Sequence, residues 1–224
     1  MHVIYLAGGI ASGKSTVARV FEELGAVRID LDDLSREALA PGSPILPQIK
    51  AAFGDDVINP VGGVKRELLA ERAFATTERT VTLEEIELPL IDELLRARVA
   101  AVAEQERAER EKDPEAAEKV VVVEVPLLDR MRGSFDMADE IIGVVCPAPA
   151  RRARAAQRGM DPRDFDRRLH QQPTEAYIKA HSSFVFNNIH TADVFDQEIR
   201  DWWHEREQQG WHNVPKKGRA GAQA

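Results

Sequence analysis

The start of the chain passes from an apolar run into a glycine-rich turn and then into a helical pattern. Residues 3–7 are largely apolar, as in a buried strand, and residues 8–15 match the spacing G-x-x-x-x-G-K-[ST]. Glycines let successive backbone N–H groups turn toward one point, and the next helix directs its positive end there. A plain turn before a helix is the alternative. It is disfavoured because strand, loop and helix stand in the order that a phosphate-binding loop requires.

The side chains of this loop point to a nucleotide triphosphate. Lys14 is predicted to bridge the β- and γ-phosphates, and Ser15 is predicted to hold Mg²⁺. We therefore expect ATP and Mg²⁺ as cofactors. The residues expected to line the phosphate site are Gly8, Gly9, Ala11, Ser12, Gly13, Lys14, Ser15 and Thr16.

Composition narrows the class of protein. The 224 residues, 43% of them hydrophobic, suffice for one domain or for one domain with a small insert. The net charge of −8 argues against a broad nucleic-acid surface, so we expect a small-molecule partner and no nucleic acid. Cys146 is the single cysteine, which excludes a disulfide within the chain and favours the cytoplasm. No run reaches the roughly 18 apolar residues of a membrane span, so no membrane partner is expected.

Apolar runs alternate with helical patterns along most of the chain. The expected strands are residues 3–7, 27–30, 120–125, 141–146 and 184–186. The expected helices are residues 14–24, 32–40, 148–158, 162–171, 174–181 and 191–208. This alternation predicts an α/β fold of the P-loop NTPase type, in which helices cover both faces of a parallel sheet. Phosphate would then bind at the carboxyl ends of the strands.

Between the second and third expected strands the pattern is helical only. Residues 44–75 favour short helices with a turn over 59–63, and residues 83–111 favour a longer helix interrupted at Leu88-Pro89. Proline is best tolerated in the first turn of a helix. We therefore expect Pro89 to begin the longer part of this helix.

A second motif follows the second expected strand, where the chain reads Ile-Asp-Leu-Asp-Asp over residues 29–33. Alternation along a strand would place Asp30 and Asp32 on the same side. The carboxylate of Asp32 is predicted to take a proton from an acceptor hydroxyl or to hold a metal-bound water. Asp33 is expected to cap the next helix instead.

A third motif is an acidic residue inside the apolar run 120–125. Burying the carboxylate of Glu124 is costly unless it has a partner. In a protein with a phosphate loop, that partner is expected to be Mg²⁺ with its water shell. An ion pair with a nearby arginine is the alternative.

A fourth motif is a basic helix. Arg151, Arg154 and Arg158 would share one helix face by their spacing of three and four residues. Three guanidinium groups on one face favour an anion such as the ATP phosphates, although a solvated face is the alternative. Because basic residues continue to Arg168, residues 150–172 are expected to form a mobile lid.

Together these motifs resemble those of the dephospho-CoA kinase family over about residues 3–190. Many kinases share the phosphate loop, whereas the Asp-x-Asp pair at 30–32 followed by Val-Pro-Leu-Leu at 125–128 is more specific. The other matching positions are 41–44, 53–54, 62–66, 71–74, 90–91, Arg154, Arg158, Gln172 and Asn188.

The resemblance implies transfer of the γ-phosphate of ATP to the ribose 3′-hydroxyl of dephospho-CoA, which completes coenzyme A. By resemblance, Asp32 is the base, Lys14 and Ser15 contact phosphate and Mg²⁺, and Arg154 is the lid arginine. Arg158 and Asn188 are expected on the nucleotide, and Glu124 beside Ser15 on the metal. The residues expected on the acceptor side are Asp32, Arg36, Arg66, Leu88, Pro126, Leu127 and Leu128.

The resemblance also implies a division of the chain. We expect one kinase domain over residues 1–212 and a disordered tail over 213–224. Within the domain, a helical acceptor-side insert is expected at about 41–112 and a lid at about 148–182. The nucleotide-binding core would then comprise about residues 1–40, 119–147 and 184–210.

Three positions depart from the family pattern on the acceptor side. Leu88 stands where the family usually has histidine, Lys65 stands where it has aspartate, and Arg130 stands where it has glutamate. Two alternatives therefore stay open: a kinase for another small acceptor, such as a nucleoside monophosphate or a sugar acid, and a weakly catalytic nucleotide- or CoA-binding protein. An active kinase is favoured because a binding protein would not need all of Lys14, Ser15, Asp32, Glu124 and Arg154.

Overall fold

The computed structural model describes residues 1–211, and the tail expected over 213–224 lies outside the described residues. The chain divides into two compact units. One unit comprises Met1–Asp30 together with the chain from Val99 onward, and the other comprises Leu31–Arg98. Within residues 1–211, no helix combines the length and the apolar character that crossing a membrane would need.

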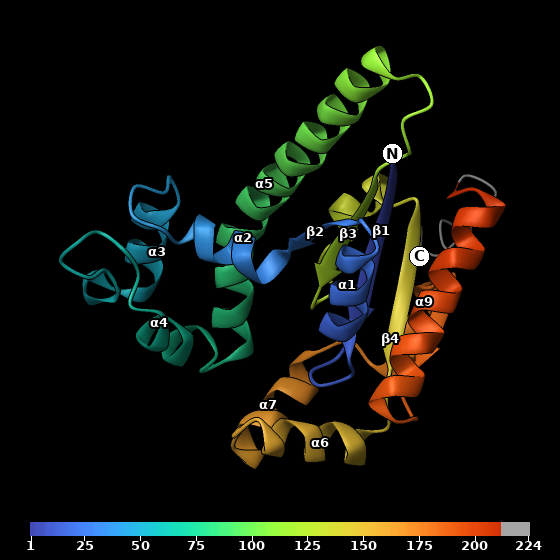
Figure 1. Cartoon of the computed structure of the whole chain (residues 1–224). Helices are drawn as coiled ribbons and strands as arrows, with labels where there is room; N and C mark the ends of the chain where they lie inside the picture. The colour runs from blue at the N-terminus through green and yellow to red at the C-terminus, as the bar shows by residue number, and fades with distance from the viewer. Residues whose placement is uncertain (212–224) are drawn as a thin grey trace. The chain divides into compact units, whose positions relative to one another are not determined.

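The first unit is built on a five-stranded sheet in the order β2-β3-β1-β4-β5, and every neighbouring pair is parallel (Figure 1). The expected α/β fold with a parallel sheet is confirmed, and each strand lies within two residues of its expected bounds. The strands are β1 (His2–Gly8), β2 (Val27–Asp30), β3 (Val120–Val125), β4 (Glu140–Val145) and β5 (Phe184–Asn187).

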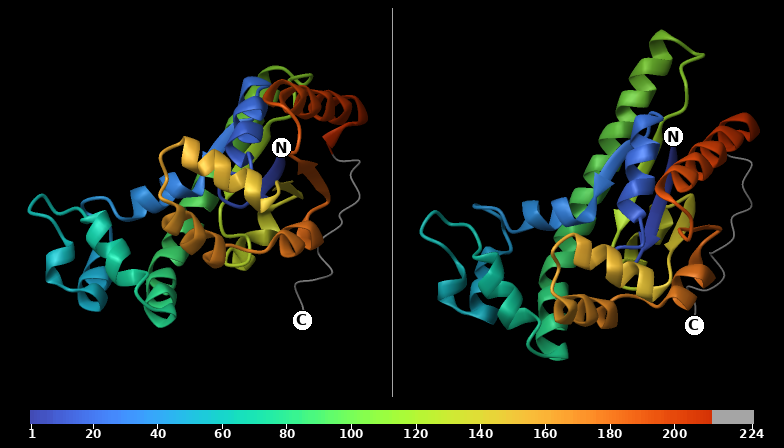
Figure 2. Two further views of the ribbon diagram at one scale, coloured as in Figure 1. Left: turned by 90° about the horizontal axis from the view of Figure 1, so that it is seen from below. Right: turned by 60° about the horizontal axis from the view of Figure 1, so that its bottom comes forward.

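Helices follow the strands of this unit much as the sequence predicts. Figures 1 and 2 show α6 and α7 beyond the carboxyl ends of the strands, at the same end of the sheet as the loop after β1. The helices are α1 (Lys14–Glu23), α6 (Ala148–Gln157), α7 (Pro162–Gln171), α8 (Glu175–His181) and α9 (Ala192–Gln209), and a 3₁₀ helix, η2, spans Arg132–Met137.

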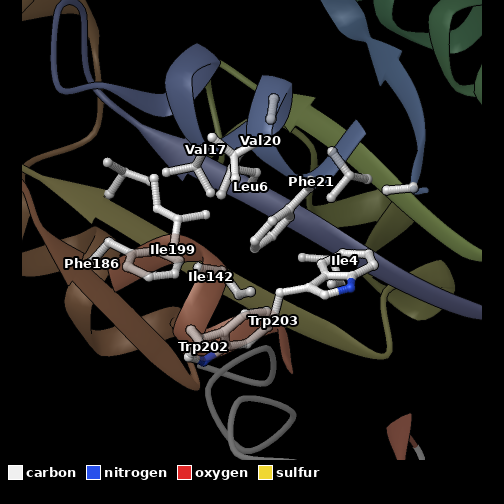
Figure 3. Packing of buried hydrophobic residues seen from close by; sticks show 14 of the residues in the cluster. Ile4, Leu6, Val17, Val20, Phe21, Ile142, Phe186, Ile199, Trp202 and Trp203 are labelled. Carbon is white, nitrogen blue, oxygen red and sulfur yellow. The ribbon is translucent and has the colours of Figure 1, made fainter. Parts of the chain in front are cut away.

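One face of the sheet packs against α1 and α9 (Figure 3). Phe21 of α1 stacks on Trp202 of α9 with ring centroids 5.3 Å apart, and Trp203 lies 5.0 Å from the same ring. Each large apolar side chain buried this way stabilises the fold by about 1.5–3 kcal/mol. This cluster fixes α1, and therefore the loop before it, against the sheet. Its labelled members in Figure 3 are Ile4, Leu6, Val17, Val20, Phe21, Ile142, Phe186, Ile199, Trp202 and Trp203.

The opposite face of the sheet is also covered. Tyr5 of β1 is fully buried there, and its hydroxyl donates to the carbonyl of Ser134 in η2 over 2.9 Å. Ile178 of α8 packs so closely on Gly143 of β4 that a Cβ at this glycine would lie 3.0 Å from its methyl group. Both faces of the parallel sheet are therefore buried, which explains why its strands read as continuous apolar runs.

The second unit is helical, as expected for the chain between β2 and β3. Ile49 and Phe53 of one short helix and Leu69 of another are buried in it, and Asn59 accepts from the amides of Val61 and Gly63 in the turn at 59–63. Its elements are α2 (Leu31–Ala38), α3 (Leu46–Phe53), a 3₁₀ helix η1 (Asp55–Val57), α4 (Arg66–Ala73) and residues 77–98 of α5 (Thr77–Lys112).

The expected interruption at Leu88-Pro89 is wrong, because α5 is one helix with Pro89 inside it. A proline inside a helix removes one backbone hydrogen bond and costs about 3 kcal/mol. Buried side chains on both sides of the proline, among them Leu83 and Ile91, keep both segments helical at that cost. The helix passes from the second unit into the first at Val99.

Candidate active site

The loop between β1 and α1 has the backbone of a phosphate cradle. Ala11 and Gly13 adopt left-handed conformations, with φ of 57° and 105°, and the amide of Ser12 donates to the carbonyl of Gly9 over 3.0 Å. A Cβ at Gly13 would lie 2.2 Å from Nδ2 of Asn188. Only glycine fits at this position, because both the backbone angle and the close approach of Asn188 exclude a side chain.

The donors of this loop suit an anionic ligand. The first amides of α1 have no acceptor within the helix, and no side chain of residues 1–211 caps this end. The hydroxyl of Ser12 is buried, and among the described residues it has no hydrogen-bond partner. Such donors at a helix start are a common binding site for phosphate. The residues present therefore fit the triphosphate of ATP.

Glu124 lies at the carboxyl end of β3, directly beside this loop. Its side chain is 1% exposed, and its Oε2 accepts from the hydroxyl of Ser15 over 2.9 Å. Nζ of Lys14 lies 3.9 Å from the same oxygen. A hydroxyl and a carboxylate oxygen side by side are ligands that Mg²⁺ prefers, with phosphate and water oxygens to complete its shell. These residues therefore fit the expected metal.

The other oxygen of Glu124 is bound by Arg28, a residue that the motif search missed. Nε of Arg28 donates to Oε1 over 2.7 Å. Burial opposes the charge of Arg28, but its hydrogen bond and its attraction to Glu124 raise the pKa of the guanidinium above its ordinary value. The expected alternatives for Glu124, a metal partner or an arginine partner, are thus compatible, one at each oxygen. The sequence feature that could have pointed to Arg28 is its position as the one arginine in the short expected strand 27–30.

Arg154 reaches the loop through Asn188. One terminal nitrogen of its guanidinium donates to Oδ1 and to the backbone carbonyl of Asn188, over 3.1 and 3.3 Å, and the other donates to Sγ of Cys146 over 3.4 Å. The side-chain Nδ2 of Asn188 in turn donates to the carbonyl of Ser12 over 2.8 Å. The sequence placed Arg154 and Asn188 in the site separately, and the structure brings them together.

Arg151 and Gln172 hold Ile10 at the outer turn of the loop. Nε of Arg151 donates to the carbonyl of Ile10 over 2.7 Å, and the amide of Ile10 donates to Oε1 of Gln172 over 2.6 Å. Arg158, by contrast, is exposed just past the end of α6, and its side chain forms no hydrogen bond or ion pair with the described residues. The expected three-arginine face therefore reduces to two arginines at the loop, because α6 ends before Arg158.

The acidic motif after β2 differs in detail from the expectation. β2 ends at Asp30 and α2 begins at Leu31, so Asp32 lies exposed in the first turn of a helix and strand alternation does not apply to it. Asp33 was expected to cap this helix, but its carboxylate forms an ion pair with Arg36 one turn on. The expectations for Asp32 and Asp33 differ from the structure for one reason: α2 starts at Leu31, one residue earlier than the sequence pattern indicates.

Leu88 and Arg66 belong to the helical unit, which also contains the acidic residue Glu87. Glu87 precedes Leu88 on α5, and burial raises the pKa of its carboxyl to about 7, with a further increase from Glu84 and an opposing effect from Arg66. Nothing in the helical sequence pattern around Glu87 indicates that its carboxyl is desolvated. Glu87 is therefore a charged or protonated group next to two expected acceptor contacts.

Residues 126–130 directly follow β3 and differ in their exposure. Leu128 is fully buried, whereas Pro126 and Leu127 are partly exposed. Arg130 donates from its guanidinium to the carbonyl of Gln171 at the end of α7 over 3.1 Å. Arg130, which stands where the family usually has glutamate, thus contacts the main chain of the expected lid.

Comparison with known proteins assigns a family to this arrangement. A family model described as dephospho-CoA kinase matches residues 2–193, which is most of the chain. The chain belongs to the dephospho-CoA kinase family. The expectation drawn from the motifs is therefore confirmed.

Members of this family resemble the chain over nearly its whole length. A dephospho-CoA kinase from Corynebacterium diphtheriae is 34% identical over 204 residues, which cover 91% of this chain and 96% of the relative. One from Corynebacterium jeikeium is 37% identical over 204 residues, covering 91% and 98%. Among solved structures, TT1252 from Thermus thermophilus has a TM-score of 0.72 at 25% identity, covering 93% of this chain and 98% of that one. A dephospho-CoA kinase from Campylobacter jejuni, at 21% identity and a TM-score of 0.63, shares the fold over 92% and 97%.

Proposed function

We propose that this protein transfers the γ-phosphate of ATP to the ribose 3′-hydroxyl of dephospho-CoA and so forms coenzyme A. The observation that carries the proposal is the grouping of Lys14, Ser15 and Glu124 at the phosphate loop of a chain that belongs to the dephospho-CoA kinase family. Catalysis of such a transfer depends mainly on positioning and on stabilising charge, since the protein needs no covalent intermediate.

The nucleotide is held by the loop and by groups around it. Backbone N–H groups of the loop from Gly8 to Thr16 donate to the phosphate oxygens, and the ammonium of Lys14 offsets the charge of the terminal phosphates. Arg154 and Asn188 also contribute at the loop, and Arg158 is proposed to join them on the nucleotide. Ser15 and Glu124 are the residues that would hold Mg²⁺, which neutralises phosphate oxygens when it is bound.

The acceptor hydroxyl needs a base. Asp32 is proposed for this role, because an exposed carboxylate in the first turn of α2 is able to accept a proton as the oxygen attacks phosphorus. The proton moves from the 3′-hydroxyl to Asp32, the new oxygen–phosphorus bond forms, and the bond to ADP breaks. The residues proposed to contact the acceptor are Arg36, Arg66, Leu88, Pro126, Leu127 and Leu128.

We propose the same division of the chain that the resemblance implies. Residues 1–212 form one kinase domain, with the acceptor-side insert at about 41–112, the lid at about 148–182 and the remainder as the nucleotide core. The compact unit Leu31–Arg98 covers most of this insert and adds α2 to it. The partner is a small molecule, and the cytoplasm, where coenzyme A precursors and ATP meet, is the proposed location.

The test is ADP release with Mg-ATP and a panel of acceptors that contains dephospho-CoA, nucleoside monophosphates and gluconate. Turnover with dephospho-CoA alone supports the proposal. Turnover with another acceptor would assign the changes at Leu88 and Arg130 to a new specificity. ATP binding without turnover of any acceptor would indicate a nucleotide-binding protein. A parallel series without magnesium tests the need for the metal.

A further inference from the structure

We propose that Arg151 is a second phosphate-binding arginine of the nucleotide site, which contacts the terminal phosphates of ATP beside Arg154. This inference rests on the proposed use of ATP. The basic helix pattern grouped Arg151 with Arg154 and Arg158 as candidates for an anion, and its contacts single out Arg151 for the terminal phosphates.

The guanidinium of Arg151 has no ion-pair partner among the described residues. Its guanidinium donates to the carbonyl of Ile10 over 2.7 Å and lies 3.5 Å from Oε1 of Gln172, and both acceptors are neutral. Across residues 1–211, no carboxylate lies within ion-pair distance of it. Burial lowers the pKa of this arginine below its ordinary value, although Cys146 and Glu175 oppose the shift. A half-buried cation of this kind gains from an anionic ligand.

The guanidinium of Arg151 lies against the phosphate loop. A Cβ at Gly9 would lie 2.2 Å from a terminal nitrogen of Arg151, so the cation rests directly on the phosphate loop. The amides that converge in this loop attract the same anion. A guanidinium has five N–H donors, and the two neutral oxygens leave others for a phosphate.

The next residue on α6, Arg152, has different partners from Arg151. Arg152 forms an ion pair with Asp166 and lies over the ring of Phe165, 5.4 Å from its centre. Two adjacent arginines on α6 therefore differ in one respect: Arg152 forms an ion pair, whereas Arg151 forms none within residues 1–211. This makes Arg152 a matched control for a change at Arg151.

A purely structural role would be to fasten α6 to the loop through Ile10. The variant Arg151→Gln is able to keep a hydrogen bond to a carbonyl but loses the charge, and Arg151→Lys keeps the charge. The two variants therefore separate fastening from phosphate binding.

The experiment is calorimetric titration of ATP and AMP into the full-length wild type, Arg151→Gln, Arg151→Lys and Arg152→Gln. We expect Arg151→Gln to weaken ATP binding by about 10-fold or more, since a hydrogen bond to a charged group is lost, while AMP binding stays within about twofold. Arg151→Lys should recover part of the ATP affinity, and Arg152→Gln should match the wild type.

The outcomes distinguish this inference from the function it rests on. If the wild type does not bind ATP, the proposed function fails. If the wild type binds ATP and Arg151→Gln binds it equally well, or loses ATP and AMP equally, the phosphate role of Arg151 is overturned. Should Arg151→Gln fold poorly, the Nε–H NMR signal of Arg151 in the wild type decides the matter. It should shift on addition of ATP, and an unchanged signal would contradict the proposal.

Discussion

Arg28 and Ser15 each donate a hydrogen bond to a different oxygen of the Glu124 carboxylate. Arg28 donates to Oε1 over 2.7 Å, and the hydroxyl of Ser15 donates to Oε2 over 2.9 Å. The arginine therefore holds the carboxylate with one oxygen turned toward the phosphate loop. The buried carboxylate thus has a cationic partner in addition to the metal that it is proposed to bind.

Removing Arg28 should destabilise the protein. Arg28→Ala leaves the charge of Glu124 buried with a less direct partner, Lys14, and breaking one side of a buried pair costs several kcal/mol. Because the side chain of Arg28 is 30% exposed, we expect a smaller loss of about 2–3 kcal/mol in the free energy of unfolding. Chemical denaturation measures it, with Arg19→Ala on the exposed side of α1 as the control. A loss no larger than that of the control would mean that water replaces Arg28 at Glu124.

Removing the ammonium of Lys14 should abolish most of the activity. Lys14→Ala takes away the charge that is proposed to face the terminal phosphates, and the loss of one such group lowers kcat by about 100-fold or more. Steady-state ADP release gives kcat, and thermal unfolding reports on the fold. A variant that keeps its melting temperature and also its turnover would remove Lys14 from the mechanism.

Replacing Asp32 by asparagine tests the proposed base. The amide has the same shape but does not accept the proton, so kcat should fall by about 10²- to 10⁴-fold with little change in the KM for ATP. Glu37→Gln, on the exposed side of the same helix and paired with Arg98, serves as the control. A near-normal rate for Asp32→Asn would require another base.

Glu87 should make stability depend on pH. Its pKa is about 7 in the folded protein and about 4.5 when the chain is unfolded, so between these values the folded state binds the proton more tightly. The free energy of unfolding should therefore fall as the pH rises from about 4.5 through about 7. Glu87→Gln should remove this loss, which makes the variant relatively more stable above pH 7. The measurement is denaturant unfolding at a series of pH values.

Glu85→Gln, at an exposed position on the same helix, is the control for that series. It should leave the pH dependence of the wild type in place. A pH profile for Glu87→Gln that follows the wild type would mean that the carboxyl of Glu87 is solvated in solution.

The elements of the parallel sheet were predictable because their signals are local. The run 120–125 and the glycine spacing of residues 8–15 each lie within one element and its flanking turn. Pro89 shows the limit of such signals, since its helix is preserved by side chains that are buried on both sides of it. Asp32 shows another limit, because a shift of one residue in the boundary between β2 and α2 decides whether Asp32 precedes the helix or lies in its first turn.

The sequence by itself determined that a phosphate loop joins a buried strand to a helix in an α/β chain, since periodicity and glycine positions are properties of neighbouring residues. Only the tertiary structure decided which side chains surround that loop. Arg28 and Glu124 are 96 residues apart in the chain, and Arg151 and Ile10 are 141 apart. The physical reason is that burial and charge pairing depend on which strands and helices become neighbours, and no local pattern records that choice.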